Sequence, residues 1–301
     1  MTDTGLAVDI AGLHKSFGHT KALDGLDLTV APGGVTGFLG PNGSGKSTTI
    51  RVLLGLLRAD GGTVRLLGAD PWHDAVQLHR RIAYVPGDVA LWPNLTGMQA
   101  IDLLAALRGK DAVDRKRRDQ LIERFELDPH KKARTYSKGN RQKVAIVAAF
   151  STHSDLFVLD EPTSGLDPLM EQAFQQCVRE VADRGAAVLL SSHILAEVEK
   201  LCDAVTIVRA GRTVRSGALS DMRYLMRTTV TARTRADGGN LEQSGYVHDL
   251  CTDDGRLRFS VDRDDLDRAM ADLSGLGIEE LTVAPASLED MFLREYQGVG
   301  R

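Results

Sequence analysis

Short apolar runs alternate along the chain with segments whose apolar residues recur at every third or fourth position. Four runs have the length and composition of buried strands, at 34–39, 81–86, 155–161 and 186–191. Three segments have the apolar spacing of helices, at 47–57, 144–150 and 169–183. A run at 204–208 and the residues that follow predict a closing hairpin. This alternation of strands and helices predicts an α/β domain.

The first 30 residues follow a different pattern, in which apolar and polar positions alternate. Segments 6–13 and 21–30 predict antiparallel strands joined by a turn at Gly18. Phe17 lies just before this turn. Its position alone supports two roles equally: the aromatic ring either stacks on a nucleotide base or packs in the core.

A mostly helical insert interrupts the α/β pattern at about 88–150. Helical spacing covers 98–126, which predicts a small lobe of its own. The loop 88–96 leads into this lobe and carries Trp92. That side chain either accepts a helix of a partner protein or is buried within the lobe.

The pattern changes again after Ala218, which predicts one domain at 1–218 and a smaller domain at 219–301. The smaller domain has predicted strands and helices at 224–235, 255–261, 264–273, 278–283 and 287–296. It carries no chemical motif. We therefore expect the chemistry to lie in the first domain.

The charge balance argues against a nucleic-acid partner. Lys and Arg number 37 and Asp and Glu number 41, and this net charge of -4 is spread along the chain. A nucleic-acid surface needs a basic stripe that displaces counterions. The one basic cluster, 115–118, has acidic residues on both sides and predicts a solvated helix face.

Cysteine content and hydropathy indicate the compartment. The three cysteines are odd in number and widely spaced, which predicts neither a disulfide framework nor a zinc site and fits a reducing cytosol. The chain shows no signal peptide and no run of about 18 apolar residues. Any membrane role is therefore expected to depend on a partner.

A glycine-rich loop follows the apolar run 34–39. Its residues are Gly40, Pro41, Asn42, Gly43, Ser44, Gly45, Lys46, Ser47 and Thr48. Glycines allow the backbone N–H groups to turn inward around a polyphosphate, and a helix that begins near Lys46 adds its positive end. In that reading Lys46 can reach the outer phosphates and the Ser47 hydroxyl can hold Mg²⁺. The alternative for this loop alone is a glycine-rich turn that happens to carry a lysine. We call residues 40–48 the phosphate loop.

Two adjacent carboxylates end the strand 155–161. Because neighbouring side chains of a strand point to opposite sides, Asp160 is placed to support Mg²⁺ and Glu161 to face the γ-phosphate and polarise water. Two charges at the end of a buried strand are costly without a cation or hydrogen-bond donors. His193 follows the next strand and is either a γ-phosphate contact or an ordinary packed residue.

A second candidate anion site lies at 137–140, where Ser137 and Gly139 precede a helix. Taken alone, this segment is better explained as an ordinary helix N-cap. We call residues 137–140 the signature turn.

Together, the phosphate loop, the signature turn, the Asp160–Glu161 pair, the turn 164–167 and His193 resemble the nucleotide-binding domain of ATP-binding cassette (ABC) transporters. The resemblance covers about 6–218. It implies a P-loop cassette in which a RecA-like core carries an antiparallel β-subdomain and a helical subdomain, with a small C-terminal α/β domain in addition.

The resemblance also implies a composite ATPase. Two copies pair head to tail, and Ser137 and Gly139 of one close over the ATP held by Lys46 of the other. Glu161 is then the general base and His193 the γ-phosphate sensor. The resemblance further implies nucleotide contacts at Phe17, Lys138, Asn140 and Asp167.

Two departures from the family pattern concern Mg²⁺ and the signature. Gly87 replaces the usual Gln, so either Asp88 substitutes or Ser47, Asp160 and water hold Mg²⁺. The signature reads Tyr-Ser-Lys-Gly-Asn rather than Leu-Ser-Gly-Gly-Gln, which leaves the contacts of Lys138 and Asn140 open.

The segment 286–293 is similar to the C-terminal extension of ATPases that serve drug and antibiotic exporters of the ABC-2 type. We therefore expect an ATPase subunit, peripheral on the cytoplasmic face of the membrane, that works with a separate permease and a second copy of itself. The alternatives are a cassette ATPase not coupled to transport and a regulatory nucleotide-binding module with little turnover.

Overall fold

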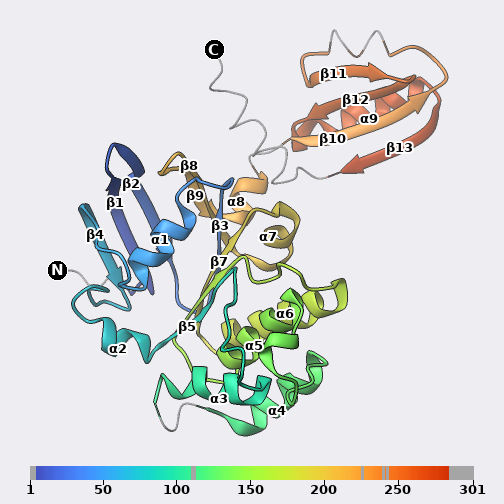
Figure 1. The fold of residues 1–301 in the computed structure, drawn as a ribbon. Coiled ribbons are helices and arrows are strands. Elements are labelled where there is room, and N and C mark those ends of the chain that lie inside the picture. The colour runs from blue at the N-terminus through green and yellow to red at the C-terminus, as the bar shows by residue number, and fades with distance from the viewer. Residues whose placement is uncertain (1–4, 110–112, 225–226, 239–240, 242–243, 285–301) are drawn as a thin grey trace. The chain divides into compact units, whose positions relative to one another are not determined.

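The computed structural model describes residues 5–109, 113–224, 227–238, 241 and 244–284, and these form two compact units. The first unit spans 1–217 and the second 218–301. We call them the first unit and the second unit and describe each by itself (Figure 1).

A six-stranded sheet forms the centre of the first unit, in the order β5-β6-β7-β3-β8-β9. Its strands are β3 (Val35–Leu39), β5 (Ile82–Val85), β6 (Leu156–Asp160), β7 (Ala187–Ser192), β8 (Ala204–Arg209) and β9 (Arg212–Ala218). The strands from β5 to β8 are parallel. The carboxyl ends of β3, β6 and β7 therefore meet at one edge, where ligands of such sheets bind.

Four helices accompany this sheet: α1 (Lys46–Leu53), α2 (Ala75–His79), α6 (Pro168–Asp183) and α7 (Leu195–Leu201). Helix α7 packs closely on β3, because a Cβ at Gly37 would lie 2.5 Å from Val198 Cγ1. A small residue is therefore required at position 37.

A separate antiparallel sheet, β2-β1-β4, precedes and follows the phosphate loop. Its strands are β1 (Val8–Phe17), β2 (Thr20–Val30) and β4 (Gly61–Leu66). Strand β1 pairs with β2 from Val8↔Val30 to Phe17↔Thr20. The two predicted N-terminal strands are therefore present, and Phe17 is the last residue of β1.

The helical lobe contains α3 (Gly97–Ala106), α4 (Arg115–Arg124), a 3-10 turn η1 (Ala133–Thr135) and α5 (Lys138–Phe150). In Figure 1 this lobe lies at the end of the first unit that is remote from β1 and β2. The segment 98–126 is thus two helices, each capped by its own residue, Thr96 and Asp114.

The basic cluster 115–118 is only partly a solvated helix face, and that prediction needs correction. Arg117 forms an ion pair with Glu180 of α6, and Arg118 pairs with Asp102 of α3 at 2.6 Å. Both arginine side chains are largely buried in these contacts, so they bind α4 to its neighbours.

The second unit has a four-stranded antiparallel sheet in the order β11-β12-β10-β13. Its elements are α8 (Leu219–Tyr224), β10 (Thr228–Thr234), β11 (Val247–Asp253), β12 (Arg256–Val261), η2 (Arg263–Asp265), α9 (Leu266–Gly275) and β13 (Ile278–Ala284). A core that includes Phe259, Val261 and Leu273 joins the sheet to α9.

Two sequence predictions for the second unit need correction. The predicted strand 224–235 begins only at Thr228, because 219–224 form the helix α8. Strand β11 was not predicted. The predicted helix 287–296 and the segment 286–293 lie outside the described residues.

Two further properties bear on function. Within the described ranges, no helix combines the length and the apolar character needed to cross a bilayer. The three cysteines are free thiols; Cys177 and Cys202 are buried, and Cys251 on β11 is exposed. Burial raises the pKa of both Cys177 and Cys202 above that of an ordinary thiol.

Candidate functional site

The phosphate loop connects β3 to α1, and close packing explains its glycines. A Cβ at Gly40 would lie 2.4 Å from the Val208 carbonyl oxygen and 2.5 Å from Ser44 Oγ. Gly45, the N-cap of α1, has a φ of 112°, which L side chains rarely adopt. The loop therefore needs glycine at both positions to hold this shape.

Lys46 is buried at the mouth of this loop, with 5% of its surface exposed. Its Nζ donates to the carbonyl oxygens of Gly40 at 2.5 Å and Pro41 at 3.2 Å. Burial lowers the pKa of Lys46, while the charges of Glu161 and Asp160 favour its charged form. The ammonium group is thus held within the loop that would carry a phosphate.

Asp160 ends β6 and has a buried oxygen, Oδ1, without a hydrogen-bond partner among the described residues. Burial raises the pKa of Asp160, and Ser191, Lys46 and Ser47 oppose that rise. An unpartnered buried carboxylate oxygen is costly. With the Ser47 hydroxyl nearby, its chemistry suits a hard divalent cation.

Glu161 and His193 approach each other just beyond the ends of β6 and β7. His193 Nδ1 lies 3.2 Å from Glu161 Oε1, and both side chains retain solvent access. Glu161 has a φ of 46°, in the left-handed region that few residues other than glycine adopt. Its backbone N–H donates to the Ser191 carbonyl oxygen at 2.9 Å. The sheet therefore brings together two side chains that are 32 positions apart in the chain.

Gly87 lies directly against Asp160 and Glu161. A Cβ there would be 3.0 Å from the Asp160 carbonyl oxygen and 3.5 Å from Glu161 Cβ. Asp88 follows it and is exposed. Gln142, which sequence reasoning missed, is 1% exposed and donates from Nε2 to the Pro86 carbonyl oxygen at 3.2 Å. Gln142 lies between Arg141 and Lys143 in the polar first half of α5, so the sequence gives no signal that sets it apart.

The signature turn is built as a helix N-terminus that contacts the turn 164–167. Ser137 caps α5 by accepting a hydrogen bond from the Asn140 N–H at 3.2 Å. Lys138 Nζ donates to Ser164 Oγ at 2.6 Å, and a Cβ at Gly139 would lie 2.3 Å from the Gly165 carbonyl oxygen. These hydrogen bonds do not lead to the phosphate loop of the same chain.

Two further predicted residues have clear local surroundings. Asp167 caps α6 by accepting from the N–H groups of Leu169 and Met170. Phe17 is 51% exposed, and Lys15 Nζ lies 5.7 Å from the centre of its ring. The core-packing reading of Phe17 is therefore wrong.

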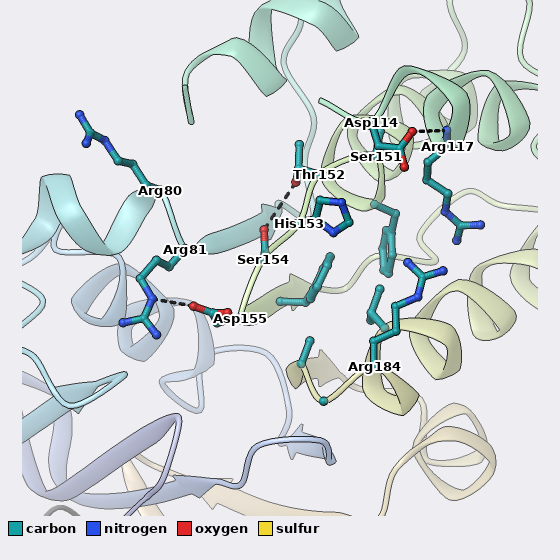
Figure 2. Close-up of a pocket in the computed structure, with 15 residues that line it drawn as sticks. Arg80, Arg81, Asp114, Arg117, Ser151, Thr152, His153, Ser154, Asp155 and Arg184 are labelled. Atoms are coloured by element: carbon teal, nitrogen blue, oxygen red, sulfur yellow. Dashed lines mark hydrogen bonds and ion pairs between the residues drawn. The ribbon is translucent and has the colours of Figure 1, made fainter. Parts of the chain in front are cut away.

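A separate cavity of about 340 Å³ lies where β6 and β7 begin, near the amino ends of these strands (Figure 2). Its charged lining includes Arg80, Arg81, Arg184 and Asp155, and Arg81 pairs with Asp155 at 2.6 Å. Figure 2 shows Arg80 directed away from the centre of this group of residues. None of the predicted site residues lines this cavity, so it is distinct from the site at the carboxyl ends.

A glycine-rich loop after the central strand β3, a buried lysine and two adjacent acidic residues at the end of β6 in the same sheet define a P-loop nucleotide hydrolase. The sequence family described as "ABC transporter" matches residues 23–164. The chain is 35% identical to the daunorubicin/doxorubicin resistance ATP-binding protein DrrA of Streptomyces peucetius, over 95% of this chain and 91% of that protein.

Two other comparisons agree. The bacitracin transport ATP-binding protein BcrA of Enterococcus faecalis is 30% identical, over 97% of each chain. A solved ATP-binding subunit of an ABC transporter aligns with a TM-score of 0.67 and 31% identity, over 72% of this chain and 92% of that one. The chain therefore belongs to the ATP-binding proteins of ABC transporters and is an ATPase of the cassette fold.

Proposed function

We propose that this chain is the subunit that hydrolyses ATP to energise an exporter of drugs or antibiotics. The contact of 3.2 Å between Glu161 and His193, near the buried Lys46, carries the catalytic part of the proposal. The names of the relatives support the transport part, since one is a drug resistance protein and another is a bacitracin transport protein.

ATP binds with its phosphates in the phosphate loop. Backbone N–H groups of the loop and the first turn of α1 point at the phosphate oxygens, and Lys46 exchanges its carbonyl contacts for the outer phosphates. Phe17, at the end of β1, offers an exposed ring on which adenine can stack.

Ser47 and Asp160 would hold Mg²⁺, because the free Oδ1 of Asp160 and the Ser47 hydroxyl are oxygen ligands of the kind this ion prefers. The ion would neutralise charge that develops on the phosphates during transfer. Gly87 offers no side chain as a further ligand, so either Asp88 or water completes the set.

Glu161 takes a proton from the attacking water, and His193 orients Glu161 and contacts the γ-phosphate. The short contact between their side chains supports this division of roles. Positioning of the water and neutralisation of charge then provide most of the rate enhancement.

A second copy of the chain completes each site. Within one chain, the signature turn contacts Ser164 and Gly165 rather than the phosphate loop. The N–H groups at the start of α5 and the Ser137 hydroxyl thus serve ATP held by the partner copy. Lys138, Asn140 and Asp167 lie on the same surface segments and belong to the proposed contact.

The proposed surface for the permease lies on loop 88–96 and an adjacent groove of about 180 Å³, between the sheet and the helical lobe. The groove is lined by Tyr84, Val89, Leu91, Leu104 and Ala148, among others. Trp92 is 49% exposed, so its burial in the lobe, the alternative reading of the sequence, is wrong. Double replacement of Leu91 and Trp92 by Ala is expected to reduce recovery of a polytopic membrane protein with the tagged chain, while ATP binding persists.

The experiment that tests the proposed chemistry is Glu161→Gln. We expect phosphate release to fall about a thousandfold, while ATP affinity is retained and an ATP-bound dimer accumulates in size-exclusion chromatography. Glu123→Gln, at an exposed position of α4, is the matched control and should behave as wild type. Undiminished turnover in the Glu161 variant would contradict the assignment of the base.

Gly87 is the one observation that favours a regulatory module with little turnover, because it removes a side chain from the catalytic pair's surroundings. The same assay separates the two functions. A regulatory module would bind ATP tightly and show negligible phosphate release in the wild-type chain, with or without a co-purified membrane protein.

A further inference from the structure

A carboxylate on α7 joins the two loops that carry the catalytic pair. Thr163 Oγ1 donates to Glu197 Oε1 at 2.6 Å, and Ser192 Oγ donates to Glu197 Oε2 at 2.9 Å. Thr163 lies two positions after Glu161, and Ser192 lies directly before His193. Each oxygen of one carboxylate therefore holds one of the loops.

The hydrogen bonds of Ser192 extend to both sides of His193. Ser192 Oγ also accepts from the Ile194 N–H at 2.9 Å, so the residues before and after His193 are bonded to each other. Ser192 and Thr163 are both buried, whereas the His193 side chain is largely exposed. The orientation of His193 thus depends on a buried support beneath it.

Glu161 needs a comparable support because its own conformation is unfavourable. Its left-handed φ is unfavourable for a non-glycine residue and persists only where the surroundings enforce it. The bonds from the Glu161 N–H to Ser191 and from the Ser164 N–H to the Glu161 carbonyl oxygen fix one side of this turn. The bond from Thr163 to Glu197 fixes the other side.

We propose that Glu197 is a positioning residue for ATP hydrolysis, which holds Glu161 and His193 at their mutual distance through Thr163 and Ser192. The proposal rests on the roles given above to Glu161 and His193. Among the described residues, the hydrogen bonds of the Glu197 carboxylate go to Thr163 and Ser192 rather than to Glu161 or His193.

A purely local role for Glu197 is the competing explanation. An acidic residue in the first turn of a helix is favourable near the helix N-terminus, and Glu197 occupies the first turn of α7. Such a role concerns the stability of α7 and does not require the two hydroxyl partners. The two explanations therefore predict different effects on kcat when Thr163 is replaced and when Glu197 is replaced by the neutral Gln.

The test compares four single variants of the full chain. Glu197→Ala removes both bonds, and Thr163→Val removes one while keeping the shape of the side chain. Glu197→Gln keeps both contacts, since its oxygen accepts from Thr163 and its amide donates to Ser192 Oγ. Lys200→Ala changes an exposed side chain on the same helix and is the control.

We expect Glu197→Ala to lower kcat about 10- to 100-fold, because small displacements of catalytic groups are costly, with KM for ATP within about threefold of wild type. Thr163→Val should lower kcat in the same way by a smaller factor. Glu197→Gln should recover most of kcat, and Lys200→Ala should match wild type. ATP affinity measured in the Glu161→Gln background should not change when Glu197→Ala is added.

Three results would overturn the proposal: unchanged kcat in Glu197→Ala, unchanged kcat in Thr163→Val, or a Glu197→Gln variant as slow as Glu197→Ala. Thr163→Val keeps the test decisive if Glu197→Ala does not fold. Failure of the proposed function would look different. A Glu161→Gln variant with normal turnover would refute the role of Glu161 as the base, and the positioning role of Glu197 would be refuted with it.

Discussion

The first and second units place their polar groups differently. All but one of the buried polar residues of the described chain lie in the first unit, and Ser260 is the exception. In the second unit several charged groups form pairs at the surface, such as Arg256 with Glu280 at 2.8 Å. Its interior is a continuous apolar core around Phe259.

The difference shows which interactions stabilise each unit. Buried polar groups cost free energy unless they are paired, and Asp160 Oδ1 has no hydrogen-bond partner among the described residues. In the ATPase that we propose, Mg²⁺ would supply that partner. The second unit has few such groups and folds on apolar burial. Substitutions should therefore alter ligand binding in the first unit and mainly stability in the second.

The largest expected effect is on the second unit. Phe259→Ala empties part of its only described core cluster and should destabilise the unit by about 3–5 kcal/mol. Differential scanning calorimetry should show a lower unfolding temperature for one transition. ATP affinity should stay within twofold of wild type. A large loss of affinity would show that the units depend on each other for ligand binding.

Lys46→Met in the first unit tests ligand binding rather than stability. It keeps an apolar chain of similar length and removes the charge, so ATP affinity should fall at least about 100-fold, or about 2.7 kcal/mol. Titration of a fluorescent ATP analogue measures this change. The control is Lys116→Met at an exposed position of α4. If affinity survived in Lys46→Met, the buried ammonium would not be a phosphate ligand.

Gly87→Ala is expected to have an intermediate effect. The new methyl group would lie 3.0 Å from the Asp160 carbonyl oxygen, which costs about 1–2 kcal/mol of stability unless the backbone yields. Gly245→Ala is the control in the second unit, since a Cβ there meets nothing within 4 Å. Equal melting temperatures of the two variants would mean that the Asp160 segment moves readily.

The smallest effect should come from Arg256→Ala in the second unit. Its ion pair with Glu280 is half exposed, and such pairs contribute between 0 and about 1 kcal/mol. Urea unfolding should show little change, and 0.5 M salt should remove what difference there is, since the Debye length is then only about 4 Å. A loss above 2 kcal/mol would place an essential polar contact in a unit that we describe as held by apolar burial.

The sequence predicts the phosphate loop and the Asp160–Glu161 pair well, because glycine spacing and a strand that ends in carboxylates are local signals. Elements with weak local preference were missed or misplaced. Strand β11 contains His248, Asp249 and Asp253, which are poor strand formers, and its pairing with β12 overrides that preference. The predicted strand 224–235 likewise starts too early, because Tyr224 is the last residue of α8.

The residues that hold the site in place could not be predicted from the sequence, for a different reason. Glu197 meets Thr163 across 34 positions, and this contact exists only because β6 and β7 lie side by side. Gln142 likewise contacts Pro86 across 56 positions. A single sequence shows which side chains carry chemistry, whereas the tertiary fold decides which side chains hold them in place.

The distribution of thiols has a practical consequence. Maleimide reagents at neutral pH require an accessible thiolate, so the wild-type chain should accept one label, on β11 of the second unit, without any engineered cysteine. A fluorophore at Cys251 would report on the second unit alone. With a fluorescent nucleotide in the first unit as the energy-transfer donor, the transfer efficiency would test whether the distance between the two labels changes during turnover.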